Sequence, residues 1–119
     1  MSNSAVVESV AQALRSAELS QTAIAPIRPE LGGESADVDI AYAVQEVNTE
    51  RALSEGRRLV GRKIGLTSKV VQAQLGVDQP DFGMLFADRA YGAGEVMPAG
   101  PRIQPKVEAE IALVINRDL

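Results

Sequence analysis

The sequence contains no cysteine and no histidine among its 119 residues. Without cysteine, the chain can form neither a disulfide framework nor a catalytic thiolate. Without histidine, it lacks the usual general base and the usual ligand of zinc. Acid–base chemistry would therefore fall to Asp, Glu, Lys, Arg, Tyr, Ser, Thr or backbone groups, and any bound metal would be held mainly by oxygen.

Aromatic residues are scarce too, since the chain has two tyrosines, two phenylalanines and no tryptophan. We therefore expect a core of Val, Leu, Ile and Ala, in a chain long enough for one domain or part of one. The net charge of −4 argues against a nucleic-acid-binding surface, which needs a basic face. One cluster of basic residues indicates instead a small-anion site or a solvated face: Arg57, Arg58, Arg62, Lys63 and Lys69.

The first 19 residues have neither a basic n-region nor a long apolar run. They are therefore typical neither of a signal peptide nor of a membrane span. We expect a cytoplasmic protein that does not associate with membranes.

Apolar residues at helical spacing predict two helices in the N-terminal half. The first is expected over 4–17, with Ser4 as its N-cap, and the second over 37–54, followed by a stop at Gly56. The prolines and glycines over 22–35 predict a loop between these helices.

The next part of the chain alternates short structured segments with turns. Residues 59–66 predict a strand, in which Gly61 and Gly65 indicate a bulge or a close backbone approach. Residues 68–75 predict a short helix that begins after Ser68. A turn-rich loop over 76–83 and a short apolar stretch at 84–86 follow.

Period-two alternation over 102–116 predicts a further strand, which carries Glu108 and Glu110. In a strand, residues i and i+2 point to the same side, so two carboxylates can converge on one hard cation such as Mg²⁺ or Mn²⁺. A solvated strand face explains the pair equally well, with Lys106 or Arg102 compensating the two negative charges.

Lys63 and Asp81 are the candidates for acid–base chemistry. Lys63 lies between two glycines among mostly apolar neighbours, so its ammonium could bind a carboxylate or take part in proton transfer. Asp81 lies in the predicted loop and could be an acid or a base in a chain without histidine. A surface lysine and a turn aspartate are the simpler explanations of the two residues.

Three segments, in this order and spacing, resemble the 2-keto-4-pentenoate hydratase branch of the fumarylacetoacetate hydrolase superfamily. Their sequences are GRKIGLTS at 61–68, QLGVDQPDFG at 74–83 and IQPKVEAEIALV at 103–114. The resemblance covers nearly the whole chain but only the N-terminal part of the family's length. It implies an α+β chain, with an N-terminal helical segment over 1–57 and the first strands of a mainly-β catalytic domain over 58–119.

The resemblance also implies a site. Glu108 and Glu110 match two of three acidic residues that hold Mg²⁺ or Mn²⁺, and the third lies beyond the last residue here. Lys63 matches a catalytic and substrate-binding lysine, and Asp81 a catalytic aspartate. We therefore expect a fragment or a truncated product that does not complete the active site by itself.

The activity implied is that of a hydro-lyase in the catabolism of aromatic compounds. The enzyme would add water to 2-hydroxypenta-2,4-dienoate (2-keto-4-pentenoate) to give 4-hydroxy-2-oxopentanoate, as a homo-oligomer that can pair with a decarboxylase or aldolase.

Several alternatives stay open. The first is a related decarboxylase of the 4-oxalocrotonate type, in which Arg62 or Lys69 would bind a second substrate carboxylate. Others are a non-catalytic assembly subunit and a fragment with only a structural role.

Overall fold

The computed structural model describes residues 3–33, 37–98 and 102–117. Its elements follow in this order: α1 (Asn3–Ser20), η1 (Arg28–Leu31), α2 (Val38–Ser54), β1 (Leu59–Gly65), α3 (Lys69–Leu75), β2 (Asp81–Phe86) and η3 (Ala87–Arg89). This confirms the expected α+β class and all three expected helices. None of the helices in the described ranges is long and apolar enough to cross a membrane.

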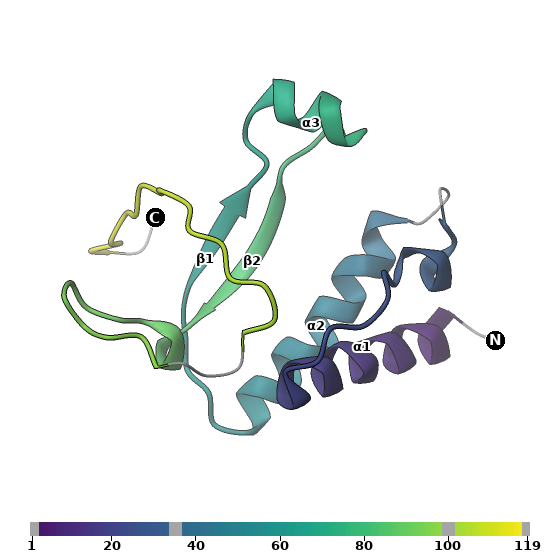
Figure 1. Cartoon of the computed structure of the whole chain (residues 1–119), viewed down its shortest axis with the longest axis horizontal. Coiled ribbons are helices and arrows are strands. Elements are labelled where there is room, and N and C mark those ends of the chain that lie inside the picture. The colour runs from purple at the N-terminus through teal and green to yellow at the C-terminus, as the bar shows by residue number, and fades with distance from the viewer. Residues whose placement is uncertain (1–2, 34–36, 99–101, 118–119) are drawn as a thin grey trace.

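Helices α1 and α2 lie side by side and form a helical layer (Figure 1). Its core consists of Val10, Ala11, Leu31 and Val44, each at most 9% exposed. Burying a valine or leucine side chain contributes roughly 1.5–3 kcal/mol, so these few contacts stabilise the layer. Asn48 adds a polar link by donating from Nδ2 to the Ala11 carbonyl oxygen over 3.0 Å.

The ends of the helices follow local chemistry. The Asp37 carboxylate caps α2 by accepting from the backbone N–H of Asp39 over 3.0 Å. Gly56, with φ +88°, reverses the chain just after α2, as its position predicts. The expectation for Ser4 is wrong, because α1 already includes Asn3 and Ser4 therefore lies inside the helix.

Strands β1 and β2 form an antiparallel sheet, and α3 lies between them in the chain, at the far tip of the hairpin (Figure 1). The register shifts between Leu59 and Gly61, which confirms the irregularity expected there. β2 begins at Asp81, so the predicted loop over 76–83 is too long. Aspartate is common in turns, but Asp81 lies opposite Gly65 and pairs with β1, so it belongs to the strand.

The strand predicted over 102–116 is wrong for this structure, because residues 102–117 contain neither helix nor strand. A strand needs a neighbour to satisfy its N–H and C=O groups, and no described residue pairs with this segment. Its apolar side chains are open to solvent, with Val107 102%, Ile111 93% and Val114 94% exposed. The radius of gyration of 16.0 Å also exceeds the ~13.5 Å typical of a compact domain of this length.

Candidate active site

The hairpin brings Lys63 and Asp81 onto one face. Lys63 lies opposite Gly83 and Asp81 lies opposite Gly65 in the β1–β2 register. Residues that lie opposite each other share a face, as do residues two apart along a strand. Lys63 and Asp81 are therefore diagonal neighbours, which is close enough for a long side chain to reach across.

Two glycines make room for these side chains. A Cβ added to Gly83 would lie 3.2 Å from Cγ and 3.5 Å from Cδ of Lys63, so the lysine stem runs across Gly83. A Cβ added to Gly65 would overlap the Asp81 carboxylate and lie 3.3 Å from Lys63 Nζ. The ammonium and the carboxylate thus converge above Gly65, which confirms the close approach that this glycine indicates.

The two charged groups converge without forming an ion pair with each other, and neither has another ion-pair partner in the described residues. Both residues are exposed. An unpaired ammonium beside an unpaired carboxylate can bind a substrate carboxylate and move a proton within one site.

Helix α2 contacts the same end of the hairpin. The backbone N–H of Phe82 donates to Tyr42 Oη over 3.1 Å, and the Phe82 carbonyl oxygen accepts from Gln45 Nε2 over 3.1 Å. Tyr42, Gln45 and Asp81 also line a hollow of about 450 Å³, together with Arg28. Neither Tyr42 nor Gln45 was expected from the sequence to have a functional role. Their spacing of one helical turn was the available signal, but α2 has several other polar residues, among them Asn48, which hydrogen-bonds to α1.

The predicted basic cluster is dispersed by the fold. Arg62 lies on the opposite face of β1 from Lys63, where Nη1 approaches Met84 Sδ at 3.2 Å. Lys69 holds the hairpin tip together by donating to Gln72 Oε1 over 3.1 Å and to the Asp78 carbonyl oxygen over 3.3 Å. Within the described part of the chain, Lys63 therefore has no second cation beside it from this cluster.

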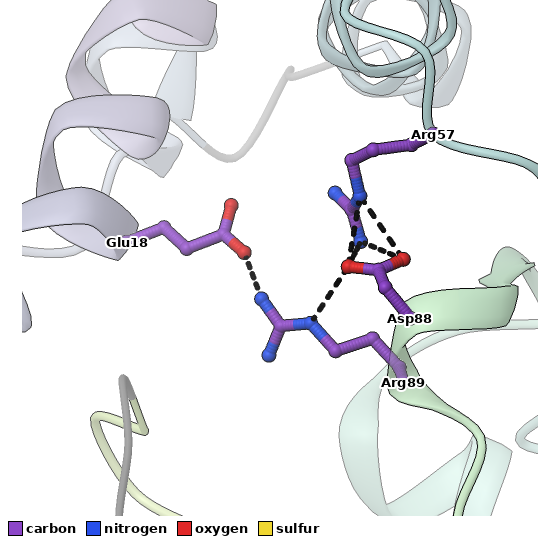
Figure 2. A network of polar contacts seen from close by, with 4 residues as sticks. All are labelled: Glu18, Arg57, Asp88 and Arg89. Atoms are coloured by element: carbon purple, nitrogen blue, oxygen red, sulfur yellow. Dashed lines mark hydrogen bonds and ion pairs between the residues drawn. The ribbon is translucent and has the colours of Figure 1, made fainter.

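Arg57 belongs instead to a network at the other end of the hairpin, shown in Figure 2. Its guanidinium donates to both carboxylate oxygens of Asp88 and lies 4.2 Å from the centre of the Phe86 ring. The hydrogen bond from Arg57 holds the pKa of Asp88 below its ordinary value. Arg89 contacts Asp88 and pairs with Glu18 at 2.5 Å, which ties η3 to α1.

Glu108 and Glu110 are exposed and belong to no strand. Their donor chemistry fits a hard divalent cation, because both are carboxylates and both are open to solvent. Among the residues described, however, no three acidic side chains gather in one place. The described residues thus offer two of the three acidic ligands that the resemblance implies. They do not gather Glu108 and Glu110 with Asp81 in one place.

Comparison with known proteins gives a consistent set of relatives. The chain is 62% identical over 121 aligned positions to 2-keto-4-pentenoate hydratase 1 of Dechloromonas aromatica. It is 56% identical over 119 positions to the 2-keto-4-pentenoate hydratase of Burkholderia vietnamiensis. Both alignments cover 100% of this chain. The chain is related to 2-keto-4-pentenoate hydratases over its whole length.

The chain spans 45% of the length of each of these two hydratases and matches their N-terminal part. The resemblance inferred from the three sequence segments is therefore confirmed. No family model matches the chain.

Solved structures support the fold. The 4-oxalocrotonate decarboxylase of Pseudomonas putida G7, complexed with magnesium and adipate, superposes with a TM-score of 0.63 and 30% identity. The same enzyme complexed with calcium and acetate gives the same TM-score and identity. In each case the match covers 72% of this chain and 32% of the other. These relatives of known structure were thus solved with a divalent cation and a small carboxylate.

Proposed function

We propose that this chain supplies the Lys63 and Asp81 part of the active site of a metal-dependent 2-keto acid hydratase. The observation that carries the proposal is the convergence of the Lys63 ammonium and the Asp81 carboxylate above Gly65. It occurs in a chain 62% identical to a 2-keto-4-pentenoate hydratase. The substrate would be 2-hydroxypenta-2,4-dienoate and the product 4-hydroxy-2-oxopentanoate.

The reaction needs one proton transfer and one addition of water. The proton of the hydroxyl on carbon 2 leaves and a proton joins carbon 5, which gives a conjugated 2-keto acid. Water then adds across the double bond, with its hydroxyl at carbon 4 and its hydrogen at carbon 3. The Asp81 carboxylate would accept and return the protons, while the Lys63 ammonium would bind the substrate carboxylate.

Glu108 and Glu110 are proposed as two ligands of Mg²⁺ or Mn²⁺. When bound, such an ion would act as a Lewis acid and stabilise negative charge on the oxygen at carbon 2. Carboxylate oxygens are the ligands that both ions prefer, and the related decarboxylase was solved with magnesium and with calcium.

The division of the chain into a helical segment over 1–57 and a catalytic part over 58–119 belongs to the same proposal. It is supported by the end of α2 at Ser54 and the start of β1 at Leu59. A cytoplasmic location, a homo-oligomeric state and pairing with a decarboxylase or aldolase stay predictions of the sequence.

Decarboxylation of a dicarboxylic 2-keto acid is the second candidate, favoured by the structural likeness to 4-oxalocrotonate decarboxylase. A second substrate carboxylate would need a second cation near Lys63. Arg62 lies on the opposite face of β1 and Lys69 is engaged at the hairpin tip. Neither of these two cations therefore lies beside Lys63, and Arg28, which lines the hollow with Asp81, is the remaining candidate for this role.

The test is a completed chimaera, in which this chain is joined to the remaining part of the Dechloromonas aromatica hydratase. We expect Mg²⁺-dependent loss of the absorbance of 2-hydroxypenta-2,4-dienoate and no release of CO₂ from 2-oxohex-3-enedioate. Release of CO₂ without hydration would contradict the hydratase proposal and support the decarboxylase instead. A folded chimaera active on neither substrate would contradict both.

A further inference from the structure

The outer edge of β2 is satisfied by side chains rather than by a third strand. Phe82 lies opposite Ile64, and both of its backbone groups hydrogen-bond to α2 instead of to β1. In an antiparallel pair, a residue either exchanges both hydrogen bonds with its partner or directs both away from it. Phe82 is of the second kind, so Tyr42 and Gln45 fill the place that a neighbouring strand would take.

Tyr42 and Gln45 reach this edge from one face of α2. They are three residues apart, and residues at this spacing are neighbours on a helix surface. The tyrosine hydroxyl accepts the N–H and the glutamine amide donates to the C=O, each over 3.1 Å. One turn of helix thus presents an acceptor and a donor that match the two groups of a single residue.

The contact lies next to the candidate active site. Asp81, whose carboxylate meets Lys63 above Gly65, directly precedes Phe82 and is the first residue of β2. Terminal strand residues open more readily than central ones. The Glu18–Arg89 ion pair also joins α1 to the chain after β2 (Figure 2). Arg89, however, comes after Phe86, at the opposite end of β2 from Asp81. Only Tyr42 and Gln45, among the described residues, hydrogen-bond from the helices to the Asp81 end.

We propose that Tyr42 and Gln45 are positioning residues, which fix Phe82 so that the Asp81 carboxylate stays above Gly65 beside the Lys63 ammonium. The significance of this arrangement for catalysis rests on the proposed function. The arrangement itself does not, and it can be tested without turnover.

The test uses NMR on the 119-residue chain with Tyr42→Phe, Gln45→Glu and the double variant. Tyr42→Phe removes the acceptor and keeps the ring, whereas Gln45→Glu removes the donor and keeps the shape. We expect hydrogen exchange of the Phe82 amide to rise about fivefold to tenfold in Tyr42→Phe, as for the loss of one hydrogen bond. The Gly83 amide, which faces β1, should change less than twofold.

The arrangement of the site is followed by the nuclear Overhauser effect between Lys63 Hε and Gly65 Hα. We expect this signal to weaken at least twofold in Gln45→Glu and in the double variant. Gln45→Lys keeps a donor at this position and should retain the signal. Matched controls are Tyr91→Phe and Gln74→Glu, since neither side chain hydrogen-bonds within the described part of the chain; both should leave exchange and signal unchanged.

An unchanged signal in both Gln45→Glu and the folded double variant would overturn the proposal. So would equal acceleration of all β2 amides in Tyr42→Phe, because the two residues would then only stabilise the hairpin. If the double variant does not fold, the two single variants decide by the same criteria. An inactive chimaera, by contrast, would contradict the proposed function and leave these NMR outcomes unaffected.

Discussion

The hairpin and the segment after it carry two halves of the same expected site, but only the hairpin arranges its half. Lys63 and Asp81 lie on one face because β1 and β2, which are neighbours in the chain, pair with each other in this register. Glu108 and Glu110 lie in a segment that has no strand partner among the described residues, and their apolar neighbours are exposed. Pairing of two strands that are neighbours in the chain thus forms the half of the site with Lys63 and Asp81. The half with Glu108 and Glu110 has no such pairing among the described residues.

The largest expected effect concerns the carboxylate pair. Glu108→Gln combined with Glu110→Gln should abolish Mg²⁺-dependent turnover in the completed chimaera, since both proposed charged ligands are lost. Calorimetric titration of Mg²⁺ should show binding by the chimaera that disappears in the double variant.

The same titration sharpens the comparison when it is made on the 119-residue chain alone. We expect no saturable binding below millimolar Mg²⁺, because no third acidic side chain gathers with this pair in the described residues. Tight binding by the chain alone would show that the segment is already arranged. Glu46→Gln with Glu50→Gln is the matched control, since both glutamates are exposed on α2.

Lys63→Ala should lower kcat/KM of the chimaera by roughly 10²-fold or more, the range for a group that binds or moves charge in the transition state. Binding of Mg²⁺ should stay within about twofold of the wild type, because Lys63 is not a proposed ligand. Steady-state kinetics and calorimetry measure the two effects separately. Arg58→Ala, which removes another exposed cation, serves as the control, and an equal fall in metal binding would make Lys63 structural.

Gly65→Ala tests the preformed half directly. The added Cβ would overlap the Asp81 carboxylate, which is exposed and must turn away, and we expect this to lower the free energy of unfolding by roughly 0.5–1.5 kcal/mol. Gly61→Ala is the matched control, since its Cβ would meet Leu85 Cδ1 at an ordinary 3.6 Å. Urea unfolding of both variants measures the difference. Equal stability would mean that Asp81 moves away without cost.

The smallest effect is expected at Asp88, far from the Lys63 face. The Arg57 hydrogen bond lowers the pKa of Asp88 in the folded state, so ionised Asp88 stabilises the folded chain. This stabilisation is fully present above the unfolded pKa of about 4 and is lost as the pH falls through the lower folded pKa. The wild type should therefore exceed Asp88→Asn in thermal stability at pH 6, and the difference should shrink toward pH 2.

Much of the local structure was predictable from the sequence. The apolar spacing on α1 and α2, the glycines of β1 and the residue types at Lys63 and Asp81 all pointed to the elements and groups observed. The strand over 102–116 was not correctly predicted. The alternation of apolar and polar residues in this segment predicts which side chains would share a face of a strand. It does not show whether a neighbouring strand is present to pair with the segment.

The sequence by itself determined which chemistry is available: oxygen ligands, one lysine between glycines and one aspartate, with no thiol and no imidazole. The tertiary structure decided which of these groups meet. The β1–β2 register placed Asp81 diagonally from Lys63 and moved Arg62 to the other face. The contact of α2 with the first residues of β2 brought Tyr42 and Gln45 to Phe82 across 37 and more residues of chain. Contacts at such separation depend on how elements pack, which the spacing of residues within one element does not specify.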